Sequence, residues 1–206
     1  MTNPLDTEAL VIDFETSDLP ESGGVVIEAA WGRMSQGLDG APFAYSPAFR
    51  RYGLPVGRTI HPAAQALHHI WPKELTFCPI FTQESAFGLV LQPSTGHPWP
   101  YLIAHHSEFE LAMLRAYIGD ACPIPPTICT ERCARHLFPE AENWNLQYLR
   151  YYLNLENGEA SAYGHPAHSA YADVFITQLL VCRMLEMGKT LDALHQLTCL
   201  PVHYPR

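Results

Sequence analysis

Short apolar runs, separated by polar stretches that contain glycine and proline, recur along the first half of the chain. Residues 10–14, residues 24–32 and a segment near residues 43–45 are expected to form consecutive antiparallel strands. Two later apolar runs, residues 101–104 and 127–129, have the length of further short strands. The intervening stretch from 36 to 59 is rich in glycine, proline and arginine, so it is expected to be largely loop.

The second half of the chain shows the three- and four-residue spacing of helices. Ala172, Ile176, Leu180 and Met184 follow one another at intervals of four and predict a helix over residues 170–187. Strands that come first and then alternate with helices indicate an α/β or α+β fold. A helix is also expected to start at Ser107, and others are predicted over residues 62–69, 83–91, 131–137, 145–152 and 191–197.

Two acids stand one residue apart at the end of the first predicted strand, Asp13 and Glu15. Side chains alternate along a strand, so both point to the same face. At about 4 Å and an effective dielectric near 20, two such charges repel by roughly 4 kcal/mol, and a hard divalent cation would convert this repulsion into binding. The alternative is that the strand ends at Asp13 and that both acids are solvated.

A histidine and an acid flank the start of the long predicted helix. Asp173 falls in its first turn, and His168 precedes it by five residues, which is about 140° around an ideal helix. The two can serve one site only if His168 lies before the helix, and the coil expected over residues 156–166 allows that. The alternatives are a solvated loop histidine and an acid stabilised by the helix dipole.

Composition describes an ordinary globular chain. The 206 residues are 48% hydrophobic and 16% charged, which suits one α/β domain. No apolar run has transmembrane length, and the first residues lack a basic, signal-like start, so a cytoplasmic protein without a membrane partner is expected. The six cysteines contain no C-x-x-C pair, which fits a reducing compartment. Cys129, Cys133 and His136 could form a metal trio, although no fourth ligand is evident.

The net charge of −9 is unusual for a protein that binds polyanions. Arg50, Arg51 and Arg58 gather in one predicted loop and could form a local phosphate patch, or they could be dispersed surface residues. This charge balance argues against long nonspecific tracking along DNA. It favours short contact with a terminus, or short oligonucleotides as substrate, or a partner that supplies the basic surface.

Three segments together resemble the motifs of the DEDDh, or DnaQ-like, family of 3′-to-5′ exonucleases. Asp13–Leu19 is similar to D-x-E-T-[TS]-G-L, residues 104–110 are similar to A-H-N-A-x-F-D, and His168 to Asp173 matches H-x-x-x-x-D. Their order and spacing agree with the family from about residue 9 to residue 187. Two further segments, residues 60–70 and 129–139, resemble exonuclease X, a member of this family.

The resemblance implies a ribonuclease H-like α/β fold, with a mixed central sheet of three antiparallel strands plus parallel strands, flanked by helices. It implies one exonuclease domain over residues 1–206, with its core at about 9–187 and a closing helix and tail at about 188–206. The implied activity is hydrolysis of phosphodiester bonds at nucleic-acid 3′ ends, most readily single-stranded DNA, with release of nucleoside 5′-monophosphates. RNA as substrate and the oligomeric state stay open.

The resemblance also assigns roles. Two Mg²⁺ or Mn²⁺ ions per site would support an in-line displacement. Asp13 would bridge both ions, Glu15 and Asp173 would complete the nucleophile-side metal site, Glu110 would support the second metal, and His168 would be the general base. The implied substrate-binding residues are Phe14, Thr16, Ser17, Leu19, His68, His106 and Phe109. Phe109 could equally belong to a helix core, and Leu19 to a loop that covers the sheet.

Three residues depart from the family motifs: Asp18 replaces a glycine, His106 an asparagine and Glu110 an aspartate. Glu110 could reach a metal with its extra methylene. It could instead fold back to the backbone N–H of Ser107 in a capping box. The departures motivate an alternative function, a catalytically weakened module of the same fold that binds nucleic acid or a protein partner.

Overall fold

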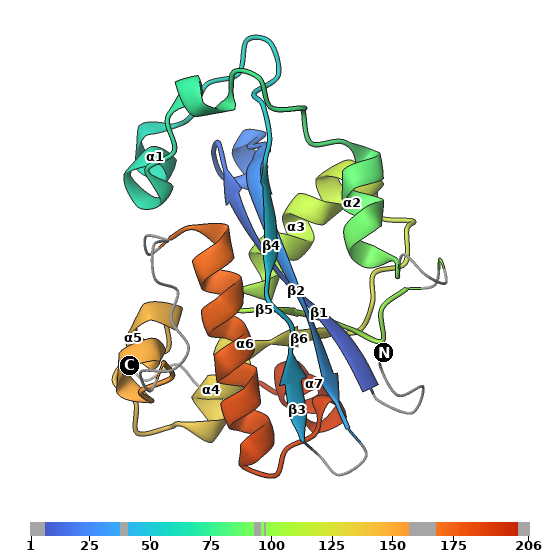
Figure 1. Cartoon of the computed structure of the whole chain (residues 1–206), viewed down its shortest axis with the longest axis vertical. Helices are drawn as coiled ribbons and strands as arrows, with labels where there is room; N and C mark the ends of the chain where they lie inside the picture. The colour runs from blue at the N-terminus through green and yellow to red at the C-terminus, as the bar shows by residue number, and fades with distance from the viewer. Residues whose placement is uncertain (1–6, 38–40, 93–95, 97, 157–167, 202–206) are drawn as a thin grey trace.

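The computed structural model describes residues 7–37, 41–92, 96, 98–156 and 168–201 (Figure 1). The coil expected over residues 156–166 lies outside these residues, apart from Glu156. The strands are β1 (Thr7–Thr16), β2 (Val26–Gln36), β3 (Pro42–Ala44), β4 (Ala48–Arg51), β5 (Tyr101–Ala104) and β6 (Thr127–Cys129). The helices are α1 (Pro62–His68), α2 (Gln83–Val90), α3 (Ser107–Ile118), α4 (Thr130–Leu137), α5 (Leu146–Tyr152), α6 (Ala170–Glu186) and α7 (Leu191–Cys199), with 3₁₀ turns η1 (Pro20–Ser22) and η2 (Pro72–Leu75).

The strands form one mixed sheet in the order β3-β2-β1-β5-β6, and β4 also pairs with β2. The long hairpin-like pair β1–β2 is antiparallel, whereas β5 lies parallel to β1, and β6 lies parallel to β5. The predicted ribonuclease H-like α/β arrangement of three antiparallel strands plus parallel strands is therefore confirmed, and the predicted helices are present.

The fourth antiparallel strand, β4, corrects the sequence analysis, which expected largely loop over residues 36–59. Its first three residues are exposed, and among the described strands it pairs with β2 alone. Alternation of apolar and polar residues arises when a strand buries one face. An exposed edge strand buries neither, so β4 leaves no such pattern in the sequence.

Alternate residues of β1 pack against different helices. Ala9 and Val11 belong to a buried cluster that includes residues of α6, whereas Leu10 and Ile12 belong to a cluster with residues of α2 and α3. Figure 1 shows the same arrangement, with α6 on one side of the sheet and α2 and α3 on the other. The period of two continues past Val11, so the next residues on the α6 face are acids.

Two secondary expectations concern membranes and cysteines. Among the described helices, none combines the length and the apolar character needed to cross a bilayer. All six cysteines are free thiols. Cys129 and Cys133 donate to the backbone oxygens of His105 and Leu194, and within the described residues they form no metal-ligating group with His136.

Candidate active site

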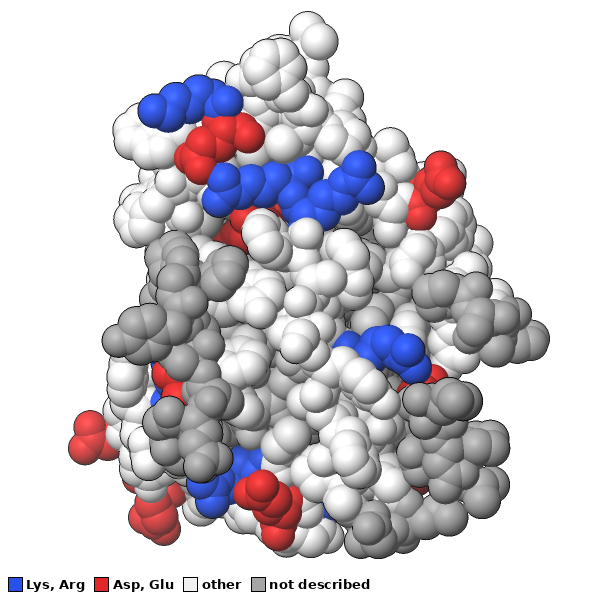
Figure 2. All heavy atoms as spheres, in the orientation of Figure 1, with Lys and Arg blue, Asp and Glu red and all other residues white. Residues whose placement is uncertain are grey.

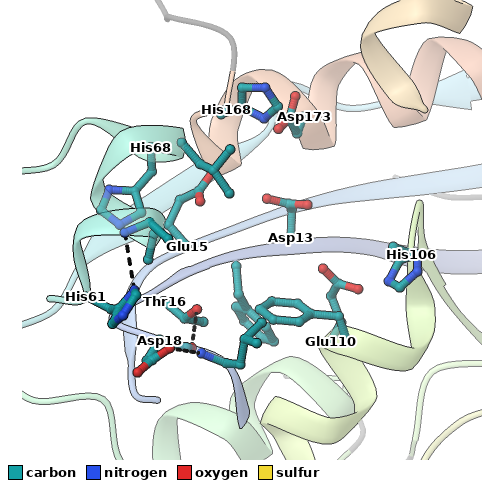
Figure 3. A pocket seen from close by; sticks show the side chains of 16 residues that line it. Asp13, Glu15, Thr16, Asp18, His61, His68, His106, Glu110, His168 and Asp173 are labelled. Carbon is teal, nitrogen blue, oxygen red and sulfur yellow. Dashed lines mark hydrogen bonds between the residues drawn. The ribbon is translucent and has the colours of Figure 1, made fainter. Parts of the chain in front are cut away.

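A cavity of about 500 Å³ opens at the carboxyl end of β1. Its walls come from β1 and the following turn, from α1, and from the N-terminal ends of α3 and α6 (Figure 3). A second cavity of about 460 Å³ extends from it toward α5. The residues that line both cavities are the polar centre of the site: Asp13, His106, Glu110, His168 and Asp173.

Three carboxylates converge at this centre, although the first, Asp13, and the last, Asp173, are 160 positions apart in the sequence. One oxygen each of Asp13, Glu15 and Asp173 lies within 4.8 Å of the others, and they are the one group of potential metal ligands found among the described residues. Figure 3 shows Asp13 and Asp173 pointing toward each other from β1 and α6. The alternative that the strand ends at Asp13 is wrong, because β1 continues to Thr16 and pairs with β2 throughout.

The start of α6 positions the histidine of the site. Ser169 is the N-cap, and its hydroxyl accepts a hydrogen bond from the backbone N–H of Ala172 at 3.3 Å. His168 therefore lies before the helix, as predicted, with a left-handed backbone (φ 60°) and an exposed side chain. This turn brings His168 close enough to Asp173 for its charge to lower the pKa of that carboxyl, partly offsetting the effect of burial.

Glu110 projects from the first turn of α3 into the same space. The N-cap of α3 is His106, one residue before the position that a capping box with Glu110 requires, and Ser107 is already a buried helical residue. The capping-box interpretation is therefore wrong. Glu110 is 4% exposed, and its Oε2 has no hydrogen-bond partner. A buried carboxylate oxygen without a partner is costly, and a cation is the ligand that would satisfy it.

Burial and mutual repulsion raise the pKa values of the carboxyl groups in this cluster. Burial, followed by the charge of Asp173, raises the pKa of Asp13 and of Glu15 well above their usual values. Burial also raises the pKa of Glu110 to about 8 and that of Asp173 to about 6. A set of acids whose ionised form is disfavoured by its surroundings is a candidate functional site, and oxygen-only donors suit hard divalent ions.

These pKa shifts predict how stability depends on pH and metal. Between the unfolded pKa values near 4 and the raised folded values, the native state holds more protons than the unfolded state. The free energy of unfolding of the metal-free protein should therefore fall as pH rises from 5 to 8. Mg²⁺ or Mn²⁺ at about 100 times its dissociation constant should restore about 2.7 kcal/mol, or a melting shift of about 5–10 °C.

The measurement is thermal unfolding in EDTA and in Mg²⁺ or Mn²⁺ at pH 5.5 and pH 8. We expect the metal-induced shift to be larger at pH 8, where the carboxylates are more ionised. A shift of equal size at both pH values would contradict the assignment of these acids as ligands. Glu8→Gln is the matched control, since Glu8 pairs with Arg33 on the same two strands, outside the site.

The residues predicted to contact substrate divide into two groups. Ser17 does not line the cavity, because its hydroxyl accepts a hydrogen bond from the backbone N–H of Val25 at 3.0 Å and holds the turn after β1. Leu19 is 53% exposed at the cavity wall, while Phe109 both lines the cavity and packs against the core cluster behind it. The other predicted residues also line the cavity: Phe14, Thr16, His68 and His106.

The turn that carries Asp18 is held locally. The Asp18 carboxylate accepts from the backbone N–H of Leu19 at 2.8 Å, and Thr16 donates to the Asp18 carbonyl at 2.8 Å. Gly24 packs against this turn so closely that a Cβ there would lie 2.0 Å from the Asp18 carbonyl oxygen. The aspartate that replaces the motif glycine therefore stabilises the turn with its own side chain.

Several residues of the site were not predicted individually. Gln147 donates to Asp173 Oδ1 at 2.9 Å, and no pattern in the sequence of α5 indicated this contact. Glu28 lies close enough to raise the pKa of Glu15. The sequence did offer one signal for Glu28, because it is a single acid within the apolar run of a predicted strand. Four more lining residues fall in the segment 60–70 noted for its resemblance: His61, Ala63, Ala64 and Leu67.

Comparison with known proteins gives structural relatives. No family model matches the sequence, and no curated protein sequence is significantly similar to it. Among solved structures, exonuclease X in complex with 5′-overhanging duplex DNA superposes with a TM-score of 0.68 and 23% identity, over 92% of this chain and 99% of that one.

Two further structures show the same likeness. The nuclease domain of 3′hExo, a DEDDh family member bound to rAMP, has a TM-score of 0.66 and 14% identity, over 91% of this chain and 96% of that one. Exonuclease I of E. coli in complex with a dT13 oligonucleotide has a TM-score of 0.61 and 16% identity, over 86% of this chain and 41% of that one. The chain therefore has the ribonuclease H-like fold of the DEDDh 3′-exonucleases, the family that its motifs resemble.

Proposed function

We propose that this protein is a metal-dependent 3′-to-5′ exonuclease, which hydrolyses the terminal phosphodiester bond of a nucleic acid and releases nucleoside 5′-monophosphates. The convergence of Asp13, Glu15 and Asp173 within 4.8 Å, beside a cavity of about 500 Å³, is the observation that supports it most strongly. Acids collected in this way are favourable mainly when they share cations.

The donor set fits Mg²⁺ or Mn²⁺, which prefer carboxylate oxygens. Asp13, Glu15 and Asp173 would hold the first ion, and Asp13 with Glu110 would hold the second. When bound, such ions lower the pKa of water and stabilise charge on the attacking and leaving oxygens. Gln147 keeps Asp173 oriented through its amide hydrogen bond. The unpartnered Oε2 of Glu110 would gain a cation as its partner.

His168 is proposed as the general base. Its side chain is exposed to the cavity rather than buried, and it precedes the helix that carries Asp173. A ring nitrogen of His168 would take the proton from the attacking water, and solvent access would let the proton leave afterwards. An imidazole suits this role because its ordinary pKa lies near neutral pH.

Substrate recognition is proposed to rest on apolar contact with the terminal base. Leu19, Leu67 and Phe109 line the larger cavity and could sandwich a base regardless of its identity, as an enzyme that degrades any sequence requires. Figure 2 shows few basic side chains on the face drawn, in separate groups with acids beside several of them. A short grip on a single-stranded DNA end fits this surface better than extended duplex contact.

The test is digestion of an oligonucleotide labelled at the 5′ end in Mn²⁺, in Mg²⁺ and in EDTA. We expect a ladder that shortens from the 3′ end in metal only, with nucleoside 5′-monophosphates as the product in chromatography. The same assay on single-stranded DNA, duplex DNA and RNA of matched sequence compares the rates on these substrates. If no metal-dependent shortening occurs over hours, the proposal is overturned and the alternative, a binding module, is favoured.

Glu110 is the residue that motivates this alternative, so its substitution discriminates between the two functions. Glu110→Gln preserves shape and removes the charge, and we expect turnover to fall by about 10²-fold, comparable to the loss of one electrostatic stabiliser. Glu110→Asp should leave turnover equal or lower, because the side chain becomes one methylene shorter and its carboxylate would lie farther from the proposed metal position. A rise of tenfold or more in Glu110→Asp would instead mean that the native glutamate weakens catalysis. Single-turnover rates in Mn²⁺ measure both variants.

A further inference from the structure

Glu28 of β2 is a buried acid to which the proposed chemistry gives no role. It is 2% exposed and lies directly opposite Glu15 in the β1–β2 register, so it faces the same side of the sheet as the acidic cluster. It does not line the cavity. A carboxylate so close to Asp13 and Glu15 that it raises the pKa of both is unfavourable unless contacts of its own compensate.

The Glu28 carboxylate makes two contacts that bind separate elements together. Its Oε1 accepts a hydrogen bond from the backbone N–H of Ala170 at 3.1 Å, and its Oε2 accepts from Arg51 Nε at 3.0 Å. Ala170 is the first residue of α6, where backbone N–H groups lack intrahelical partners and the dipole favours negative charge. Ser169 caps Ala172, so Glu28 supplies from the sheet the acceptor that Ala170 needs.

Arg51 extends the connection to the other side of the cavity. Its Nη1 donates to Glu74 Oε1 at 2.6 Å, and Glu74 Oε2 accepts from the backbone N–H of Trp71 at 2.7 Å. Trp71 is the N-cap of the η2 turn, and Glu74 is its third residue. This turn follows α1, which supplies Leu67 and His68 to the cavity wall. Arg51 is therefore engaged by two acids and does not belong to a free phosphate patch.

We propose that Glu28 and Arg51 are positioning residues: Glu28 fixes the first turn of α6, which places His168 and Asp173, and Arg51 joins that turn to the α1–η2 wall of the cavity. The inference rests on the proposed function for its kinetic consequences. Its structural basis, the anchoring of α6 to β2, is independent of that function. Reacting groups tolerate little displacement, and about 1 Å can cost 10²-fold in rate.

The first test uses Glu28→Gln and Arg51→Gln, with Glu8→Gln as the control. Glu8 pairs with Arg33 at 2.7 Å between the same strands, away from the cavity. In metal-free protein, amide hydrogen exchange at residues 170–173 should become at least about tenfold faster in Glu28→Gln and in Arg51→Gln, and should stay unchanged in Glu8→Gln. Unaltered exchange in both site variants would overturn the inference. Arg51→Gln alone decides the matter if Glu28→Gln does not fold, since Arg51 is partly exposed.

The second test separates positioning from general stability by kinetics in Mn²⁺. Glu28→Gln should lower kcat by about 10–100-fold with KM within about twofold, because it displaces the reacting groups. Glu74→Gln, which frees the α1–η2 wall, should raise KM severalfold with kcat within about twofold. The double variant Glu28→Gln/Arg51→Gln should be no slower than the slower single variant, because both act through one contact. Equal losses of kcat in Glu28→Gln and Glu74→Gln would contradict the assignment.

The two proposals fail in different ways. If the wild-type protein shows no metal-dependent hydrolysis, the proposed function fails, whereas the exchange measurement still decides the anchoring role. The Mn²⁺-induced melting shift gives a further readout without turnover: it should shrink in Glu28→Gln, where Asp173 is displaced, and persist in Glu8→Gln. A full shift in Glu28→Gln, together with wild-type exchange, would reject the positioning role even in an active enzyme.

Discussion

Asp13→Asn should abolish turnover, with a fall of about 10³-fold or more in the single-turnover rate. Asp13 is central to the cluster: its ionisation is opposed by the charges of Asp173, Glu110 and Glu15, so it lies within electrostatic reach of every other acid of the site. It is also the residue proposed to contact both metal ions. Loss of several kcal/mol of charge stabilisation corresponds to this factor, since each 1.36 kcal/mol is tenfold.

The same substitution, Asp13→Asn, should raise the stability of the metal-free protein although it lowers turnover. Removing one charge relieves the repulsion in the metal-free cluster, so the apo Asp13→Asn protein should melt higher than wild type at pH 8 and gain less from Mn²⁺. Asp120→Asn is the control, because Asp120 is exposed near the end of α3. Retention of more than about a tenth of wild-type turnover in Asp13→Asn, with normal metal-induced stabilisation, would exclude Asp13 as the shared ligand.

His168→Ala should lower the single-turnover rate by about 10²–10⁴-fold, the usual contribution of a general base. The Mn²⁺-induced melting shift should persist, because His168 is not among the three clustered ligands. Added imidazole should recover part of the rate, since the cavity that His168 lines is open to solvent.

His69→Ala is the matched control for this substitution. His69 is also exposed and also has a left-handed backbone, with φ 59° against 60° for His168, so both substitutions change the same local strain. We expect its rate to stay within about threefold of wild type. If His168→Ala instead abolishes the metal-induced shift and leaves the single-turnover rate intact, His168 is a metal ligand or a structural residue and not the base.

Local patterns in the sequence predicted most strands and helices of this fold and the parts of its site, whereas the arrangement of the layers came from the family resemblance. The period of two in β1 placed Asp13 and Glu15 on one face, and the period of α6 placed Asp173 in its first turn with His168 before it. These predictions succeeded because the spacing of side chains along a strand or a helix depends only on backbone geometry. The roles assigned to these residues stay predictions until the variants are measured.

Tertiary structure decided what no local pattern contains. β4 left no alternation of apolar and polar residues because it buries neither face. The Ser17 hydroxyl accepts a hydrogen bond from the backbone N–H of Val25 instead of facing the cavity. The capping box with Glu110 is excluded because α3 has its N-cap at His106. Which acids meet, and which backbone group each one satisfies, depends on packing between segments more than 100 residues apart, as between Glu28 and Ala170. The free energy of a buried charge is set by all of its neighbours in space, and the order of residues along the chain specifies those neighbours only through the complete fold.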